Sequence, residues 1–277
     1  MGMGRAGRES GGLFGRPRIR RIRGLNSGAM WENIRVMKQL FIVKTGSTFA
    51  STAKQYGDFE DWTRAALGPV EIAVAVVDPR QGVPLPRPSE CAGVVITGSH
   101  AMVTDSHPWS LQLERWIADL IDAETPLFGI CFGHQLLARA TGGTVGFHPH
   151  GIEIGTTQID LLAESAQDSI FQDLPDTFAA HVAHSQTVLE LPPNAVRLAA
   201  NSHEVNHAMR IGPRAWGIQF HPEFDPAIMR AYIHEQADQL RPQGINPQIV
   251  AEHVTDTPTA SMVLRRFAQL AISTAHS

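Results

Sequence analysis

The chain has 277 residues, of which 43% are hydrophobic and 18% charged, and its net charge is −4. This ordinary globular balance suits one large α/β domain or two small ones, and no apolar run approaches the 18 or more residues of a membrane span. The two cysteines, Cys91 and Cys131, allow at most one disulfide and lack the spacing of a zinc site. We therefore expect a cytoplasmic protein with reduced thiols and no membrane contact.

The charge is unevenly distributed along the chain. Residues 1–36 hold eight Arg and two Glu, a net +6, which leaves −10 for residues 37–277. The first segment is Gly- and Arg-rich without apolar periodicity, so we interpret it as a disordered tail or as a misassigned start, with translation beginning at Met30 or Met37. A transit peptide and a nucleic-acid-binding arm are the alternatives for this segment. The acidic remainder argues against nucleic acid as the main partner.

Apolar runs and amphipathic stretches alternate through the first half of the chain. The expected strands and helices lie at residues 40–43, 58–67, 71–77, 93–97 and 108–122. The third strand is apolar throughout, as expected for a strand covered on both faces. The polar loop at residues 44–57 follows a strand at its carboxyl end, where open α/β sheets bind ligands.

Cys131 lies at the centre of the most informative stretch, Pro-Leu-Phe-Gly-Ile-Cys-Phe-Gly-His-Gln-Leu-Leu-Ala-Arg-Ala-Thr-Gly-Gly at residues 126–143. A Gly-x-Cys-x-Gly between a short apolar run and a helical pattern is typical of a nucleophile elbow, a turn so sharp that only small residues fit beside the nucleophile. The helix N-terminus that follows favours a thiolate over a thiol. The alternative is a buried, inert cysteine.

A second informative stretch, Trp-Gly-Ile-Gln-Phe-His-Pro-Glu-Phe at residues 216–224, begins about 90 residues downstream. Its strand-like run ends in His221, and Glu223 follows two residues later. Residues i and i+2 of an extended backbone point the same way, so Glu223 can orient the imidazole and stabilise its charged form. Together with Cys131 this predicts a Cys–His–Glu catalytic arrangement.

These two stretches carry a family resemblance. Cys131-Phe-Gly-His-Gln135 and Gly217-Ile-Gln-Phe-His-Pro-Glu223 resemble the class I (triad-type) glutamine amidotransferases, and the resemblance extends over roughly residues 37–225. The similarity is closest to the amidotransferase domain of GMP synthase and to the stand-alone γ-glutamyl peptidases. It implies a flavodoxin-like α/β three-layer sandwich with a mostly parallel central sheet. It also implies one domain at residues 37–277, which we expect to include a helical cap at residues 225–277.

The resemblance implies an oxyanion hole formed by Phe132 and by the loop at residues 98–105. Gly98 and Ser99 are the matching positions in that loop, although this sequence departs from the more usual Gly-Gly-Pro of the family. A turn that begins with Gly can direct backbone N–H groups into the space above the sheet. A plain strand–helix turn without such a role is the alternative.

The resemblance also implies a set of substrate contacts. Gln135 lies one helical turn beyond Cys131 and would face the same pocket. His184, Ser185 and Gln186 match a segment whose main chain contacts the α-amino and α-carboxylate groups of glutamine. Other members often have Gly or Asp where Ser185 and Gln186 stand, a change that a backbone contact tolerates.

The second half of the chain predicts further strands and two terminal helices. We expect strands at residues 143–147, 152–161, 196–199 and 215–220 and helices after Asp225 and at residues 259–273. His148-Pro-His-Gly151 is interpreted as a solvated turn, since no third metal ligand is indicated. Glu153-Ile-Gly155 is similar to a Glu-x-Gly that the family has in the same place.

The implied reaction is hydrolysis of the side-chain amide of glutamine or of a γ-glutamyl compound through a Cys131 thioester, with no cofactor and no metal. The chain contains no Ser-Gly-Gly-x-Asp-Ser phosphate loop, so it is not expected to make GMP alone. Two alternatives stay open: a subunit that passes ammonia to a separate synthetase, and a catalytically silent binding or regulatory paralogue. We lean slightly towards a stand-alone hydrolase, and a homodimer also stays open.

Overall fold

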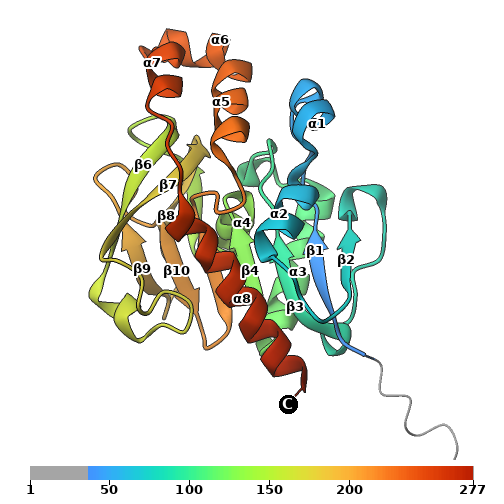
Figure 1. Ribbon diagram of the computed structural model, residues 1–277. Helices are drawn as coiled ribbons and strands as arrows, with labels where there is room; N and C mark the ends of the chain where they lie inside the picture. Colours follow the sequence, from blue (N-terminus) through green and yellow to red (C-terminus); the bar gives the residue numbers. More distant parts are fainter. Residues whose placement is uncertain (1–36, 277) are drawn as a thin grey trace, which may run out of the picture. The chain divides into compact units, whose positions relative to one another are not determined.

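The computed structural model describes residues 37–276, which form a nine-stranded sheet and a separate two-stranded sheet (Figure 1). The large sheet has the order β2-β1-β3-β4-β11-β10-β9-β6-β7. Its strands are β1 Gln39–Val43, β2 Val74–Val77, β3 Cys91–Ile96, β4 Leu127–Ile130, β6 Glu153–Leu161, β7 Thr177–His184, β9 Val196–Ala200, β10 Ala208–Ile211 and β11 Ala215–Ile218. The small sheet pairs β5 Thr144–Phe147 with β8 Gln186–Glu190. The interpretation of residues 1–36 lies outside the described residues, and the domain division stays a prediction.

The large sheet has a parallel half and an antiparallel half. Strands β2, β1, β3, β4 and β11 pair in parallel, whereas β10, β9, β6 and β7 extend the sheet with antiparallel pairs. Every residue of β3, β4 and β11 is buried, as expected for strands covered on both faces. The parallel half therefore lies inside the molecule and carries the carboxyl-end edge at which ligands bind in such folds.

Helices cover both faces of this sheet. The helices are α1 Ala50–Tyr56, α2 Phe59–Leu67, α3 Pro108–Asp122, α4 Phe132–Ala140, α5 Pro226–Glu235, α6 Ala237–Leu240, α7 Pro247–Glu252 and α8 Pro258–His276. Side chains of α3 and α4 pack with one face of the strands, and side chains of α2 and α8 pack with the other. The expected α/β three-layer sandwich is thereby confirmed. No helix among residues 37–276 has the length and hydropathy needed to cross a membrane.

The structure divides the C-terminal tail into two parts with different positions. The helices α5, α6 and α7 pack around a small core of their own with Phe59 and Trp62 of α2. Helix α8 instead lies along a face of the sheet, where it contacts α2, β3 and β7 (Figure 1). Its Phe267 and Ala271 belong to the main core. The tail is therefore a cap in its first part and a layer of the sandwich in its second.

Several elements differ from those that the sequence predicts. The polar loop at residues 44–57 contains α1, which has a single fully buried residue, Thr52, and thus little apolar periodicity. The expected long helix after Asp225 ends at Glu235 and is followed by the short α6 and α7. Strand β10 was not expected. Its four residues include Arg210, which interrupts the apolar run.

Candidate active site

Cys131 lies on the sharp turn between β4 and α4 that its glycine neighbours predict. Its backbone has φ 49° and ψ −98°, a strained conformation for a residue other than glycine, and its N–H donates to Ile218 O over 2.8 Å. A Cβ on Gly129 would lie 2.4 Å from Gly133 O, and a Cβ on Gly133 would lie 2.5 Å from Ile96 O. Both glycines are therefore required by close backbone packing around the cysteine.

His221 and Glu223 form a buried pair beside this turn. His221 Nδ1 lies 2.8 Å from Glu223 Oε1, and the N–H of His221 donates to His181 O over 2.8 Å. The imidazole also stacks on Phe224 at a ring distance of 4.2 Å. A Cβ on Gly98 would lie 3.1 Å from His221 Cε1 and 3.8 Å from Cys131 Cβ, so this glycine touches both residues. The structure thus brings together the three residues predicted to form the triad.

The electrostatics of this group favour a protonated imidazole. Burial alone would lower the pKa of His221, but its charge interactions and hydrogen bonds with Glu223 and Cys131 outweigh burial and raise that pKa to about 10. A proton on His221 is what a leaving nitrogen needs, since the imidazolium can act as the general acid. The arrangement can therefore supply a proton donor beside the Cys131 sulfur.

The predicted oxyanion-hole residues surround the same point. Phe132 is the first residue of α4, so its N–H has no acceptor within the helix. Ser99 Oγ donates to Thr45 O over 2.9 Å and accepts from Ala101 N at 3.0 Å, which holds the loop after Gly98 in shape. The side chain of Ser99 is thereby engaged within the loop, and its N–H is the group that fits an oxyanion role. This role stays a prediction for all three residues.

The predicted substrate contacts form the inner wall of the site, which we define as the side chains of Gln135, His184, Ser185 and Gln186. Gln135 Nε2 donates to Gln186 O over 2.7 Å and to Gln219 Oε1 over 3.0 Å. Gln186 Nε2 donates to Thr104 Oγ1 over 2.6 Å. Ser185 Oγ lies 3.9 Å from Met102 Sδ. The nitrogens of both amides are thus held by the protein.

Behind the inner wall lies a buried charged group that the sequence did not predict as a unit. His184 Nε2 lies 2.9 Å from Glu153 Oε2, and its Nδ1 lies 3.1 Å from Gln186 O. Both partners are acceptors, so the His184 ring links the Glu153 carboxylate to the Gln186 backbone. Glu153 also accepts from Asn201 and lies 3.3 Å from His207 Nε2.

The pKa of Glu153 reflects these contacts. Burial would raise this pKa, but hydrogen bonds and charge interactions with His184 and His207 lower it well below the ordinary carboxyl range. Glu153 was noted in the sequence for its place in a Glu-x-Gly motif. Its partners lie 31 and 54 residues further along the chain, and no local pattern signals such contacts.

The turn at His148-Pro-His-Gly151 is exposed at its last three residues, as the sequence predicts, and differs from the prediction at His148. His148 is buried and stacks on His203 at a ring distance of 4.2 Å, with its Nε2 3.9 Å from Glu204. The stacking partner comes from a distant segment, which local sequence does not reveal. Among residues 37–276, no three or more His, Cys, Asp or Glu are arranged to hold a metal ion.

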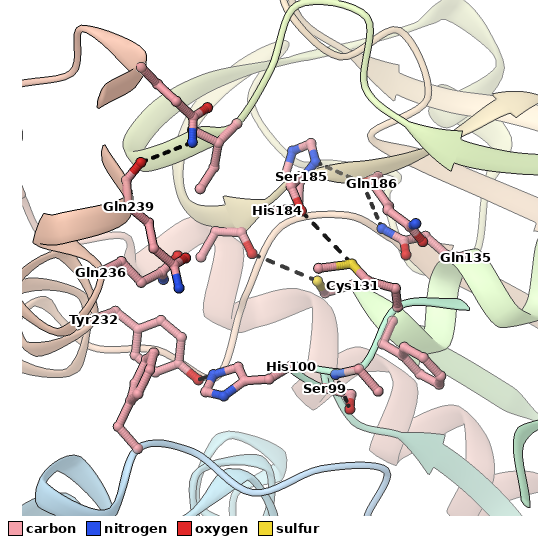
Figure 2. Close-up of a pocket in the computed structure, with 17 residues that line it drawn as sticks. Ser99, His100, Cys131, Gln135, His184, Ser185, Gln186, Tyr232, Gln236 and Gln239 are labelled. Atoms are coloured by element: carbon pink, nitrogen blue, oxygen red, sulfur yellow. Dashed lines mark hydrogen bonds between the residues drawn. The ribbon is translucent and has the colours of Figure 1, made fainter. Parts of the chain in front are cut away.

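A cavity of about 360 Å³ opens above Cys131 (Figure 2). On one side it is bounded by the inner wall and on the other by residues of α5, α6 and the turn that follows α6. The residues on this second side are Tyr232, Gln236, Gln239 and Gln243, joined by Phe49 and His100 from the first half of the chain. The sequence did not predict a role in the site for any of these six. Figure 2 shows Tyr232, Gln236 and Gln239 facing Cys131 from the side opposite Gln135. No sequence motif marks these positions.

The sequence model of the family described as Glutamine amidotransferase class-I matches residues 55–238. The chain belongs to this family. The resemblance carried by the Cys131 and His221 stretches is thereby confirmed at the level of the family.

Two kinds of relatives are similar to this chain. γ-Glutamyl peptidase 5 of Arabidopsis thaliana is 32% identical over 172 residues, which cover 61% of this chain and 65% of that protein. One subunit of the glutamine-hydrolyzing GMP synthase of Methanopyrus kandleri is 31% identical over 170 residues, covering 59% of this chain and 83% of that protein. The glutamine-hydrolyzing GMP synthase of Aeropyrum pernix is 34% identical over 142 residues, which are 51% of this chain and only 25% of that protein. The chain thus spans less than two thirds of the first and third of these relatives.

Solved structures share the fold of this chain. A glutamine amidotransferase from Thermotoga maritima superposes with a TM-score of 0.67 at 23% identity, covering 87% of this chain and 99% of that one. A glutamine amidotransferase from Methylobacillus flagellatus gives a TM-score of 0.62 at 24% identity, covering 87% and 92%. At these identities the likeness is evidence for the fold alone.

Proposed function

We propose that the protein hydrolyses the side-chain amide of glutamine or of a γ-glutamyl compound through a thioester on Cys131. The observation that carries this proposal is the strained turn that holds Cys131 beside the buried His221–Glu223 pair, at the floor of a cavity. A silent binding paralogue would have no use for this strain or for the protonated imidazole.

In the proposed reaction the Cys131 thiolate attacks the amide carbon, and a new S–C bond forms. The N–H groups of Phe132 and of Gly98 or Ser99 hold the oxyanion, and one such donor is typically worth about 10²–10³ in rate. His221 then gives its proton to the departing nitrogen as the C–N bond breaks. Water, activated by the now neutral His221, finally cleaves the thioester and releases the γ-carboxylate.

A second candidate is an amidotransferase that passes the ammonia to a separate synthetase. It is favoured by the similarity to the GMP synthase subunit of Methanopyrus kandleri, of which the chain covers 83%. Such a protein should be slow alone and should be activated by its synthetase. A stand-alone hydrolase should reach an ordinary rate of about 1–10³ s⁻¹ on its own substrate.

The proposal is tested with Cys131→Ala, assayed on glutamine and on a panel of γ-glutamyl amides and peptides. We expect activity to vanish while the fold, followed by circular dichroism, is kept. The matched control is Cys91→Ala, because burial raises the pKa of the Cys91 thiol to about 12 and keeps it unreactive. An electrophilic glutamine analogue should label Cys131 and spare Cys91. Undiminished turnover by Cys131→Ala would overturn the mechanism.

A further inference from the structure

The cavity has a second wall on the side of Cys131 opposite Gln135 (Figure 2). We define this outer wall as Phe49, His100, Tyr232, Gln236, Gln239 and Gln243. When glutamine reacts, the leaving group is ammonia, a single non-hydrogen atom. Ammonia is too small to contact these six side chains together, so the outer wall offers surface that only a larger leaving group could use.

The position of His221 indicates which part of a substrate would lie against the outer wall. The departing nitrogen must lie within hydrogen-bond reach of the imidazole that protonates it. His221 stacks on Phe224, and the Phe224 ring lies 4.9 Å from the ring of Tyr232 in the outer wall. His100, also in the outer wall, stands two residues after Gly98, the glycine that touches His221. The outer wall therefore lies on the leaving-group side, and the inner wall on the glutamyl side.

The outer wall carries no formal charge. None of the described residues that line the cavity is Lys, Arg, Asp or Glu. Tyr232 Oη lies 2.9 Å from His100 Nε2 and 3.3 Å from Thr48 Oγ1. Burial raises the pKa of Tyr232 and lowers that of His100, so the phenol keeps its proton, the imidazole is neutral, and a hydrogen bond joins them. A charged leaving group would find no counter-ion here, and burying it would be costly.

The outer wall does carry side-chain carboxamides that make no hydrogen bond with the described part of the protein. Gln243 Nε2 donates to Gln239 O over 3.1 Å, whereas the side chains of Gln236 and Gln239 have no hydrogen-bond partner within the described part of the chain. A carboxamide offers two donors and one acceptor oxygen, which is the complement of a peptide group. Phe49 and Ile152 add apolar surface to the cavity.

We propose that the outer wall is a subsite for the leaving group and that it selects an uncharged, amide-bearing amine, such as an amino-acid amide, over ammonia and over charged amines. This inference rests on the proposed function. The balance of the reaction is unchanged: the γ-glutamyl C–N bond breaks, His221 supplies the proton to the nitrogen, and water later supplies the hydroxyl that leaves with glutamate. The preferred substrates are therefore γ-glutamyl amides whose amine part ends in an amide.

The test compares kcat/KM for γ-glutamylglycinamide, γ-glutamylglycine and glutamine. We expect the glycinamide compound to exceed the other two by about tenfold or more, the equivalent of one or two net hydrogen bonds. In the double variant Gln236→Leu/Gln239→Leu, the ratio of kcat/KM for γ-glutamylglycinamide to that for glutamine should fall about tenfold. The matched control is Gln248→Leu on α7, an exposed position outside the cavity, which should leave both values unchanged.

The outcomes separate the two proposals. A protein that hydrolyses glutamine but shows no preference for the glycinamide compound, or that prefers the carboxylate, overturns the subsite and keeps the proposed function. An unchanged ratio in the double variant overturns the role of the two glutamines. A protein that turns over none of these compounds, and that an electrophilic glutamine analogue does not label at Cys131, overturns the proposed function itself.

Discussion

The two walls of the cavity are built in opposite ways. On the inner wall the amide nitrogens of Gln135 and Gln186 are bound to protein acceptors, and the His184 ring is bound to the Glu153 carboxylate. On the outer wall the side chains of Gln236 and Gln239 are unpaired within the described residues, and they stand on or beside short helices at the surface. Polar groups fixed in advance suit the one glutamyl group that every proposed substrate shares, whereas free carboxamides suit a leaving group that varies.

The largest expected effect comes from removing the buried charge behind the inner wall. Glu153→Gln removes the carboxylate that holds His184 and Asn201, and removing one partner of a buried charged pair typically costs about 3–5 kcal/mol. The free energy of unfolding in urea measures this loss. Glu164→Gln, at an exposed position, is the matched control and should change stability by less than about 0.5 kcal/mol. A loss below about 1 kcal/mol for Glu153→Gln would show that the inner wall does not depend on this charge.

The same pair predicts a pH dependence. Because the pKa of Glu153 is lowered in the folded protein, its contribution to stability is present above the unfolded pKa of about 4.3 and is lost as pH falls through the folded pKa. Each unit of lowering corresponds to about 1.4 kcal/mol. The stability difference between wild type and Glu153→Gln should therefore be largest near neutral pH and shrink on acidification below the unfolded value. A difference that is constant from pH 7 to pH 3 would contradict the ion pair.

The smallest expected effect concerns the support of the outer wall. Asp225 Oδ1 accepts from Ile228 N over 2.8 Å and caps α5, the helix that carries Tyr232. Asp225→Ala should cost about 1 kcal/mol of stability and weaken the preference for γ-glutamylglycinamide over glutamine. Asp238→Ala, whose side chain is 97% exposed, is the control for the loss of an acidic residue in the same region. If the preference stays at its wild-type value while stability falls, the outer wall does not depend on the start of α5.

Those features of the fold and site that depend on local sequence could be predicted. Helix α3 begins and ends at the expected residues, with Pro108 at its first position, and α2 begins after Asp58, which caps it. The turn at Cys131 followed from the two glycines beside it. Helix α6 and strand β10 could not be predicted in the same way. Helix α6 has four residues, about one turn, which is too short to display a helical period, and Arg210 interrupts the apolar run of β10.

Contacts between residues that are far apart in the chain could not be predicted from the sequence either. Glu153 meets His184 through the pairing of β6 with β7, and Gln135 meets Gln219 across 84 residues of chain. The outer wall is recognisable only after α5 and α6 have been placed beside the loop that carries His100. A residue type such as Gln carries little information by itself, since it is common on exposed helices.

The pairing of β4 with β11 has a consequence for how the molecule is made. The register sets Ile218 opposite Ile130, so the strand that ends at the nucleophile is completed by a strand whose residues follow 88 positions later. Long-range parallel pairing of this kind is slow, because the closure entropy of the intervening chain must be overcome before any contact is gained. During synthesis from the N-terminus, β4 remains an open sheet edge until residue 218 has emerged, and only then do Cys131 and His221 meet. The reactive constellation can thus form only when residues 218–221 have emerged, and the cap helices α5 to α7 and the layer helix α8 are made after it.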